Sequence, residues 1–89
     1  MIEEADQLVH RIIRVRSKMR REHHAFPVEI RMDAPTAMLL RMSHPHYLEN
    51  MGQQIAMYMG MRFVIDNDIP QDEFRMFGES GSHRVELAG

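Results

Sequence analysis

Apolar positions in the first 22 residues recur with the spacing of an α-helix. Acidic side chains crowd the first turn and basic side chains the last, which suits the helix dipole. The residue before Pro27 avoids the helical region, so the pattern ends ahead of it. The sequence therefore predicts an amphipathic helix over residues 2–22. Its apolar stripe comprises Ala5, Leu8, Val9, Ile12, Ile13, Val15 and Met19.

Beyond the proline, apolar and charged residues alternate over residues 28–32, which is the period of a half-buried strand. Asp33 follows as the N-cap of a second helix, with Pro35 near its first position. This helix is short and ends near Ser43. The sequence thus predicts one strand that leads directly into one short helix.

A third helix is predicted over residues 47–58. Gly60 follows it as a natural C-terminal cap. Gly52 weakens the prediction, because a glycine inside a helix costs about 1 kcal/mol relative to alanine. The apolar stripe of this helix comprises Leu48, Met51, Ile55 and Met59.

The remaining sequence alternates short strand patterns with turn residues. Strands are predicted over residues 61–65, 74–77 and 84–87, and the segments 66–71 and 78–82 between them have turn chemistry. Consecutive short strands of this kind favour a three-strand antiparallel meander. The whole pattern predicts an α+β fold: a long N-terminal amphipathic helix, one strand, two short helices and then the meander.

Length and composition define a single domain that spans residues 1–89. The chain is 44% hydrophobic, which is too apolar for a disordered protein. A domain of this size buries only about 60–65% of its unfolded surface, so we expect a homo-oligomer or docking on a partner. The absence of cysteine excludes disulfides, thiolate metal sites and cysteine nucleophiles.

Methionine is unusually frequent, with 10 residues against six aromatic ones. Methionine adapts to irregular contacts, so a methionine-rich segment either fills a core or fills a core and also forms a protein-binding face. Both interpretations stay open at this stage. The segment concerned carries Met38, Met42, Met51, Met57, Met59 and Met61.

Charge is divided unevenly between the two parts of the chain. Residues 1–24 hold six bases and four acids, a balance of +2, whereas residues 25–89 hold five bases and nine acids, a balance of −4. A basic helix on an acidic body suits contact with an acidic surface, with phosphate or with a neighbouring copy, and it equally suits a solvated helix face. One helical ridge gathers four of the bases: Arg11, Arg14, Lys18 and Arg21.

Nucleic-acid binding is the alternative use of this ridge. It could neutralise three or four phosphates, which would give weak, salt-sensitive binding without sequence preference. The overall charge of −2 argues against a general nucleic-acid binder. No recognition helix, zinc finger or aromatic strand platform accompanies the ridge.

Catalytic and metal-binding patterns are missing from the sequence. The histidine pairs His23-His24 and His44-x-His46 lack the spacing of zinc ligands. In the acidic loop Ile69-Pro70 interrupts the pattern of a calcium site, and no glycine occupies its turn position. No serine stands in a Gly-x-Ser-x-Gly elbow. We therefore expect no enzyme activity, no cofactor and no metal.

No apolar stretch approaches the roughly 20 residues that cross a bilayer. The chain begins Met-Ile-Glu-Glu, without the basic segment and apolar core of a signal peptide. We expect no membrane contact and an intracellular location.

A specific order of residues runs through positions 28–79. A glycine, a valine-containing strand and an acidic turn that ends in proline follow one another, and Phe-Gly-Glu then closes the next strand. This order is similar to the C-terminal part of the major coat proteins of tailed phages and of their encapsulin relatives. There a Gly-x-Pro-Val strand is followed by an acidic turn ending in proline and a strand closing on Phe-Gly-Asp. The matched positions are Gly60, Val64, Asp66, Pro70, Phe77 and Gly78, with Glu79 where aspartate is usual.

The resemblance implies a phage or prophage origin and a location in the host cytoplasm or in the virion. Coat proteins are several times longer, so it implies a capsid-like module instead of a complete shell subunit. We expect a non-enzymatic structural or accessory protein that binds copies of itself or a larger assembly. The expected contact residues are the basic ridge and the tip of the hairpin formed by the acidic loop: Arg11, Arg14, Lys18, Arg21, Asp66, Asp68 and Asp72.

Overall fold

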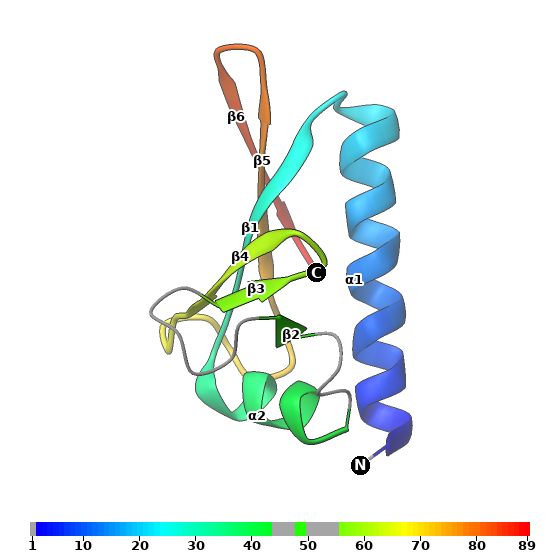
Figure 1. The fold of residues 1–89 in the computed structure, drawn as a ribbon, viewed down its shortest axis with the longest axis vertical. Helices are drawn as coiled ribbons and strands as arrows, with labels where there is room; N and C mark the ends of the chain where they lie inside the picture. The colour runs from blue at the N-terminus through cyan, green and yellow to red at the C-terminus, as the bar shows by residue number, and fades with distance from the viewer. Residues whose placement is uncertain (1, 44–47, 50–55) are drawn as a thin grey trace.

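The computed structural model describes residues 2–43, 48–49 and 56–89 (Figure 1). Helices and strands are mixed, so the predicted α+β class is confirmed. The elements in chain order are α1 (Ile2–Glu22), β1 (Phe26–Met32), α2 (Ala34–Ser43), β2 (Leu48–Glu49), β3 (Ala56–Tyr58), β4 (Met61–Ile65), β5 (Arg75–Ser80) and β6 (His83–Ala88).

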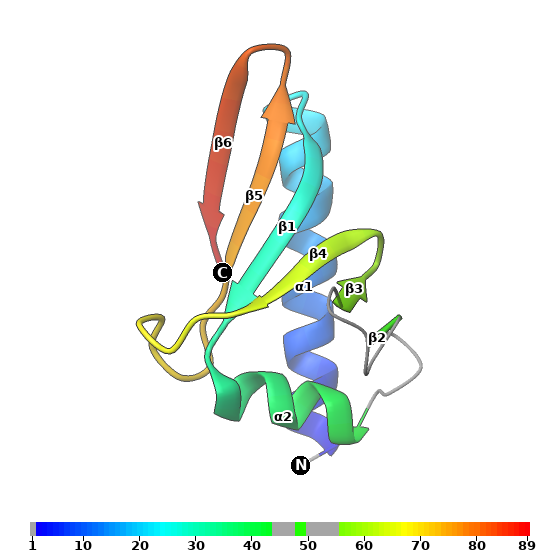
Figure 2. The ribbon, with the colours of Figure 1, turned by 60° about the vertical axis from the view of Figure 1, so that its left-hand side comes forward.

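The strands of the described residues form one mixed sheet in the order β2-β3-β4-β1-β5-β6. β1 lies between β4, to which it is parallel, and β5, to which it is antiparallel (Figure 2). The predicted three-strand meander is therefore wrong, because β4 and β5 are not neighbours. β1, which comes from the first third of the chain, separates them.

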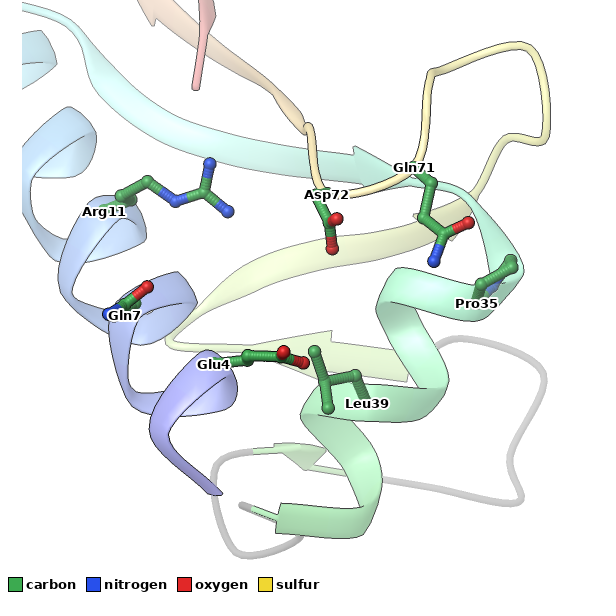
Figure 3. Close-up of a pocket in the computed structure, with 7 residues that line it drawn as sticks. All are labelled: Glu4, Gln7, Arg11, Pro35, Leu39, Gln71 and Asp72. Atoms are coloured by element: carbon green, nitrogen blue, oxygen red, sulfur yellow. The ribbon is translucent and has the colours of Figure 1, made fainter. Parts of the chain in front are cut away.

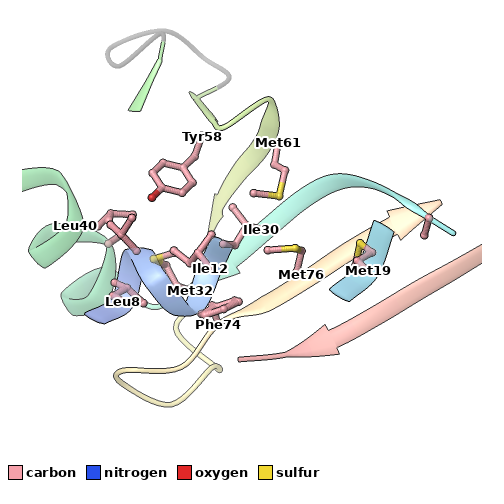
Figure 4. Packing of buried hydrophobic residues seen from close by; sticks show 13 residues of the cluster. Leu8, Ile12, Met19, Ile30, Met32, Leu40, Tyr58, Met61, Phe74 and Met76 are labelled. Carbon is pink, nitrogen blue, oxygen red and sulfur yellow. The ribbon is translucent and has the colours of Figure 1, made fainter. Parts of the chain in front are cut away.

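Helix α1 begins and ends where the sequence predicts, and it packs along one face of the sheet (Figures 1 and 2). Its stripe residues Leu8, Ile12 and Met19 are buried in the core, whereas Ile13 remains 45% exposed. Apolar side chains from α2 and from the helix-facing side of the sheet complete the core. Figure 4 shows this packing around Ile30, Met32, Leu40, Tyr58, Met61, Phe74 and Met76.

Helix α2 also forms where predicted, and Asp33 caps it. The Asp33 side-chain Oδ1 accepts a hydrogen bond of 2.9 Å from the backbone N–H of Thr36, which has no partner inside the helix. The carbonyl of Asp33 accepts the N–H of Ala37 at 3.0 Å. α2 crosses the lower end of the molecule, next to the first turns of α1 (Figure 1).

The predicted third helix is wrong over the described part of residues 47–58. Residues 48–49 and 56–58 form strands β2 and β3, and residues 47 and 50–55 lie outside the described part of the chain. Met59 and Gly60 both have positive φ, 50° and 78°, between the paired residues Tyr58 and Met61. This is the geometry of a type I′ hairpin turn, so Gly60 joins two strands instead of capping a helix.

The predicted turn over residues 78–82 is shorter in the structure. β5 runs through Gly78 to Ser80, and only Gly81 and Ser82 join it to β6. Gly78 lies within the strand and faces α1, since a Cβ built there would come within 2.3 Å of the Met19 Sδ atom. The glycine is required by close packing of strand and helix, not by a turn.

Most of the methionines whose side chains are described belong to the core. Met19, Met32, Met61 and Met76 are fully buried, whereas Met38 on α2 is 52% exposed. Met57 and Met59 are half-buried, and the side chains of Met42 and Met51 lie outside the described part. The core interpretation therefore holds for Met61, whereas Met38 is the most exposed of the described methionines in this segment.

Candidate functional site

The predicted basic ridge lies on α1. Arg14, Lys18 and Arg21 are exposed, whereas Arg11 is half-buried. None of the three exposed cations forms an ion pair with another described residue. Within the described part of the chain, three positive charges without an ion-pair partner thus lie along one helix.

The acidic loop over residues 66–74 connects β4 to β5 across the end of β1, so the expectation of a hairpin tip is corrected. Asp66 is half-buried and is tied to the sheet, because its N–H donates to the Met32 carbonyl at 2.8 Å. Its Oδ1 accepts the N–H of Asp68 at 3.1 Å, and its Oδ2 lies 3.8 Å from Arg31 Nη1. Asp66 therefore stabilises the loop from within.

Two other acidic residues of the loop face solvent. Asp68 and Asp72 are exposed, and Asp72 has a positive φ of 66°. The N–H of Asp72 donates to Thr36 Oγ1 at 2.9 Å, and the side chain of Asn67 accepts the N–H of Ala34 at 2.9 Å. These bonds hold the loop against the N-terminal end of α2.

Arg11 and Asp72 both line a polar pocket of about 630 Å³ between α1, α2 and the acidic loop. Figure 3 shows their side chains pointing into it from opposite sides. Arg14, Lys18 and Arg21 do not line this pocket. The structure therefore brings together one member of each predicted charged group. The pocket is lined by Glu4, Gln7, Arg11, Pro35, Leu39, Gln71 and Asp72.

The sheet face opposite α1 carries a charged and aromatic cluster that the sequence analysis did not single out. The guanidinium carbons of Arg31 and Arg84 lie 5.1 Å and 4.6 Å from the centre of the Phe77 ring. The buried Glu29 carboxylate accepts from Arg31 Nε at 2.5 Å and lies 3.6 Å from Arg84 Nη2. The hydrogen bond to Glu29 raises the pKa of Arg31. The sequence signal that could have indicated this cluster is the alternation that places charged residues at positions 29 and 31.

Phe26 is a further surface residue that was not predicted from the sequence. It opens β1 with 71% of its surface exposed, and the Arg20 guanidinium carbon lies 6.0 Å from its ring centre. An aromatic residue directly before a proline at the start of a strand is the sequence signal that could have indicated it. Phe26 extends the surface of the C-terminal end of α1.

His10, His23, His24 and His83 are all exposed. In the described ranges 2–43, 48–49 and 56–89, no three histidine, aspartate or glutamate side chains gather as metal ligands. His44 and His46 lie outside these ranges. No helix of the described part is long and apolar enough to cross a membrane.

Comparisons with protein-family models, with curated proteins and with solved structures found no match to the chain.

Proposed function

We propose that the chain is a non-enzymatic, phage-type structural or accessory module that works through contacts with other proteins. Its partners are further copies of the chain or a larger assembly. The observation that carries the proposal is the row of cations on α1 that pair with no other described residue, together with the exposed acids of the loop at residues 66–74. Surfaces of opposite charge on one molecule favour head-to-tail contact between copies.

The rigidity of both surfaces supports the proposal. Arg14 and Lys18 project from one helix whose apolar side is fixed in the core, and Asp72 is held by its bond to Thr36. A preorganised charged surface loses less conformational freedom on binding than a flexible one. Contacts through these groups steer association and weaken as salt screens them, with a Debye length of about 8 Å at 0.15 M.

The phage origin is supported by the resemblance over residues 28–79. Gly60 and Gly78, two of its matched positions, have clear structural roles in the β3–β4 turn and in the contact with Met19. The proposed location is the host cytoplasm or the virion.

The double variant Arg14→Glu/Lys18→Glu is expected to weaken association about tenfold, because exposed ion pairs contribute roughly 0.2–1 kcal/mol each and reversal makes them repulsive. Light scattering of the full chain over a range of protein concentrations and at two salt concentrations measures the mass. The matched control Arg41→Glu/Arg62→Glu changes the net charge equally on exposed sites elsewhere and is expected to keep the wild-type mass. Equal masses for the two double variants would contradict the role of the ridge.

Binding of nucleic acid is the second candidate, because the same exposed cations of α1 are spaced to contact successive phosphates. Three phosphate contacts predict that the logarithm of the binding constant falls with that of salt with a slope of about −2 to −3. A gel-shift titration of single-stranded and duplex DNA with the wild type and with Arg14→Glu/Lys18→Glu measures this. Absence of a shift at low salt would exclude it.

A further inference from the structure

Strand β6 forms one edge of the sheet. It is the last strand in the order β2-β3-β4-β1-β5-β6, and no described element lies beyond it (Figure 2). An edge strand carries backbone N–H and C=O groups that have no partner in the sheet, and these groups can pair with another strand. Its free groups therefore form a defined surface.

The pairing with β5 shows which groups are free. Ser80 pairs with His83 across the two-residue turn, and Phe74 and Gly89 exchange two hydrogen bonds of 3.0 Å at the other end of the hairpin. In an antiparallel pair, residues bond to the neighbouring strand at every second position. Residues 83, 85, 87 and 89 thus bond to β5, and Arg84, Glu86 and Ala88 direct their backbone groups outward.

The side chains of β6 divide between the two sheet faces. Val85 and Leu87 are half-buried and pack against the core below α1. Arg84 and Glu86 lie on the opposite face, next to the Phe77 ring. Glu86 is exposed and forms no ion pair with another described residue.

We propose that β6 pairs antiparallel with β6 of a second copy, about a two-fold axis through Val85. This register brings Arg84 opposite Glu86 of the second copy, and by symmetry Glu86 opposite Arg84 of that copy. The proposal deepens the proposed function and rests on it in one respect, namely that copies of the chain associate. It assigns a contact between copies, separate from the head-to-tail contact of the charged surfaces, to one strand and one register.

The charges select this register over its neighbours. Only Arg84, Glu86 and Ala88, whose backbone groups point outward, can exchange hydrogen bonds with the second copy. Because these residues occupy every second position, the two-fold axis passes through a residue of the strand and not between two residues. An axis at Arg84 would place the two Arg84 side chains opposite each other, and an axis at Glu86 would do the same with the two Glu86 side chains. Like charges directly opposite each other destabilise a strand pair. An axis at Val85 replaces both repulsions with two attractions, and it brings the two Val85 side chains together at a closely spaced, non-hydrogen-bonded position.

A second copy fits this edge better than an unrelated strand does. Charges on an edge strand commonly prevent pairing with other chains. An antiparallel copy of β6 presents the order Glu-x-Arg to the order Arg-x-Glu, so opposite charges face each other at both positions. The charges of β6 therefore favour one partner, a copy of the same strand. The half-buried Val85 and Leu87 would become less exposed to solvent in the dimer, which extends the core across the two-fold axis.

Glu86→Arg tests the proposal without touching the contacts of Arg84 with Glu29 and Phe77. Two pairs of like charges would replace the two attractions, so the dimer dissociation constant measured by sedimentation equilibrium of the full chain is expected to rise about tenfold or more. Glu22→Arg, an equal charge change at an exposed position at the end of α1, is the matched control and is expected to leave the constant unchanged. Circular dichroism verifies that each variant is folded.

Mixing the two single variants gives the sharpest result. Glu86→Arg carries two positive charges on the edge and Arg84→Glu carries two negative ones. Each variant alone is expected to dimerise about tenfold more weakly than the wild type or worse, and an equimolar mixture is expected to form a heterodimer. Dimerisation of Glu86→Arg at wild-type strength, or a mixture that stays monomeric, would overturn the edge pairing.

The two proposals fail in different ways. An association lost in Arg14→Glu/Lys18→Glu but retained in Glu86→Arg would refute the β6 pairing and support the head-to-tail contact. The opposite result would support the β6 pairing and refute the role of the basic ridge. A wild type that stays monomeric at millimolar concentration would overturn the β6 pairing outright.

Discussion

Replacing Phe74 with alanine is expected to remove a large share of the free energy of unfolding. The ring is fully buried in the core, and it packs against Gly89, where an added Cβ would come within 2.1 Å of it. Truncation of a buried phenylalanine costs about 3–5 kcal/mol. Small domains have a free energy of unfolding of roughly 5–15 kcal/mol, so this loss takes much of the total. Urea denaturation followed by circular dichroism measures the change.

The control for this prediction is Ile13→Ala. Ile13 belongs to the apolar stripe of the sequence, yet it is 45% exposed. We expect it to lower the free energy of unfolding by only about 0.5 kcal/mol, as surface substitutions do. Similar losses in the two variants would contradict the position of Phe74 in the core.

The second large effect is expected at the contact between Gly78 and Met19. Gly78→Ala would place a Cβ 2.3 Å from Met19 Sδ and 3.0 Å from the Phe26 carbonyl oxygen, and such overpacking costs about 1–3 kcal/mol. Met19→Ala is expected to cost about 2–5 kcal/mol through the cavity that it leaves. In the double variant the new methyl group enters that cavity, so the combined loss should fall below the sum by about 1 kcal/mol.

A double-mutant cycle by urea denaturation measures this coupling. The comparison pairs Met19→Ala with Gly60→Ala, because a Cβ at Gly60 meets no atom within 4 Å and shares no contact with Met19. Those two losses should add within about 0.5 kcal/mol. Additive losses at Gly78 and Met19 would show that α1 does not pack against β5 at this point.

Elements that depend on neighbouring residues could be predicted from the sequence. The α1 stripe, the alternation in β1 and the Asp33 cap of α2 all have local causes, and all three are confirmed. The third helix was wrong over its described residues because Gly60 suits a helix end and a hairpin turn equally, and the positive φ of Met59 leaves no trace in the sequence. The meander was wrong because the insertion of β1 between β4 and β5 is a long-range pairing.

The same distinction between local and long-range causes applies to the candidate site. Helical spacing was enough to predict that Arg14 and Lys18 share an exposed surface. That Arg11 and Asp72 line the same pocket depends on how the acidic loop lies against α2, so no local pattern predicts it. The contacts around Phe77 likewise require three strands to be in register.

The central position of β1 also determines when the molecule can become compact during synthesis. β1 pairs with β4 and β5, whose residues leave the ribosome well after it, so its two neighbours are still absent when it emerges. Until Phe74 and Met76 arrive, the apolar side of α1 is covered only by α2 and by the strands that precede β5. The fold is therefore completed by the last third of the chain, and a nascent protein of this kind depends on its final strands to hide the hydrophobic surface of its first helix.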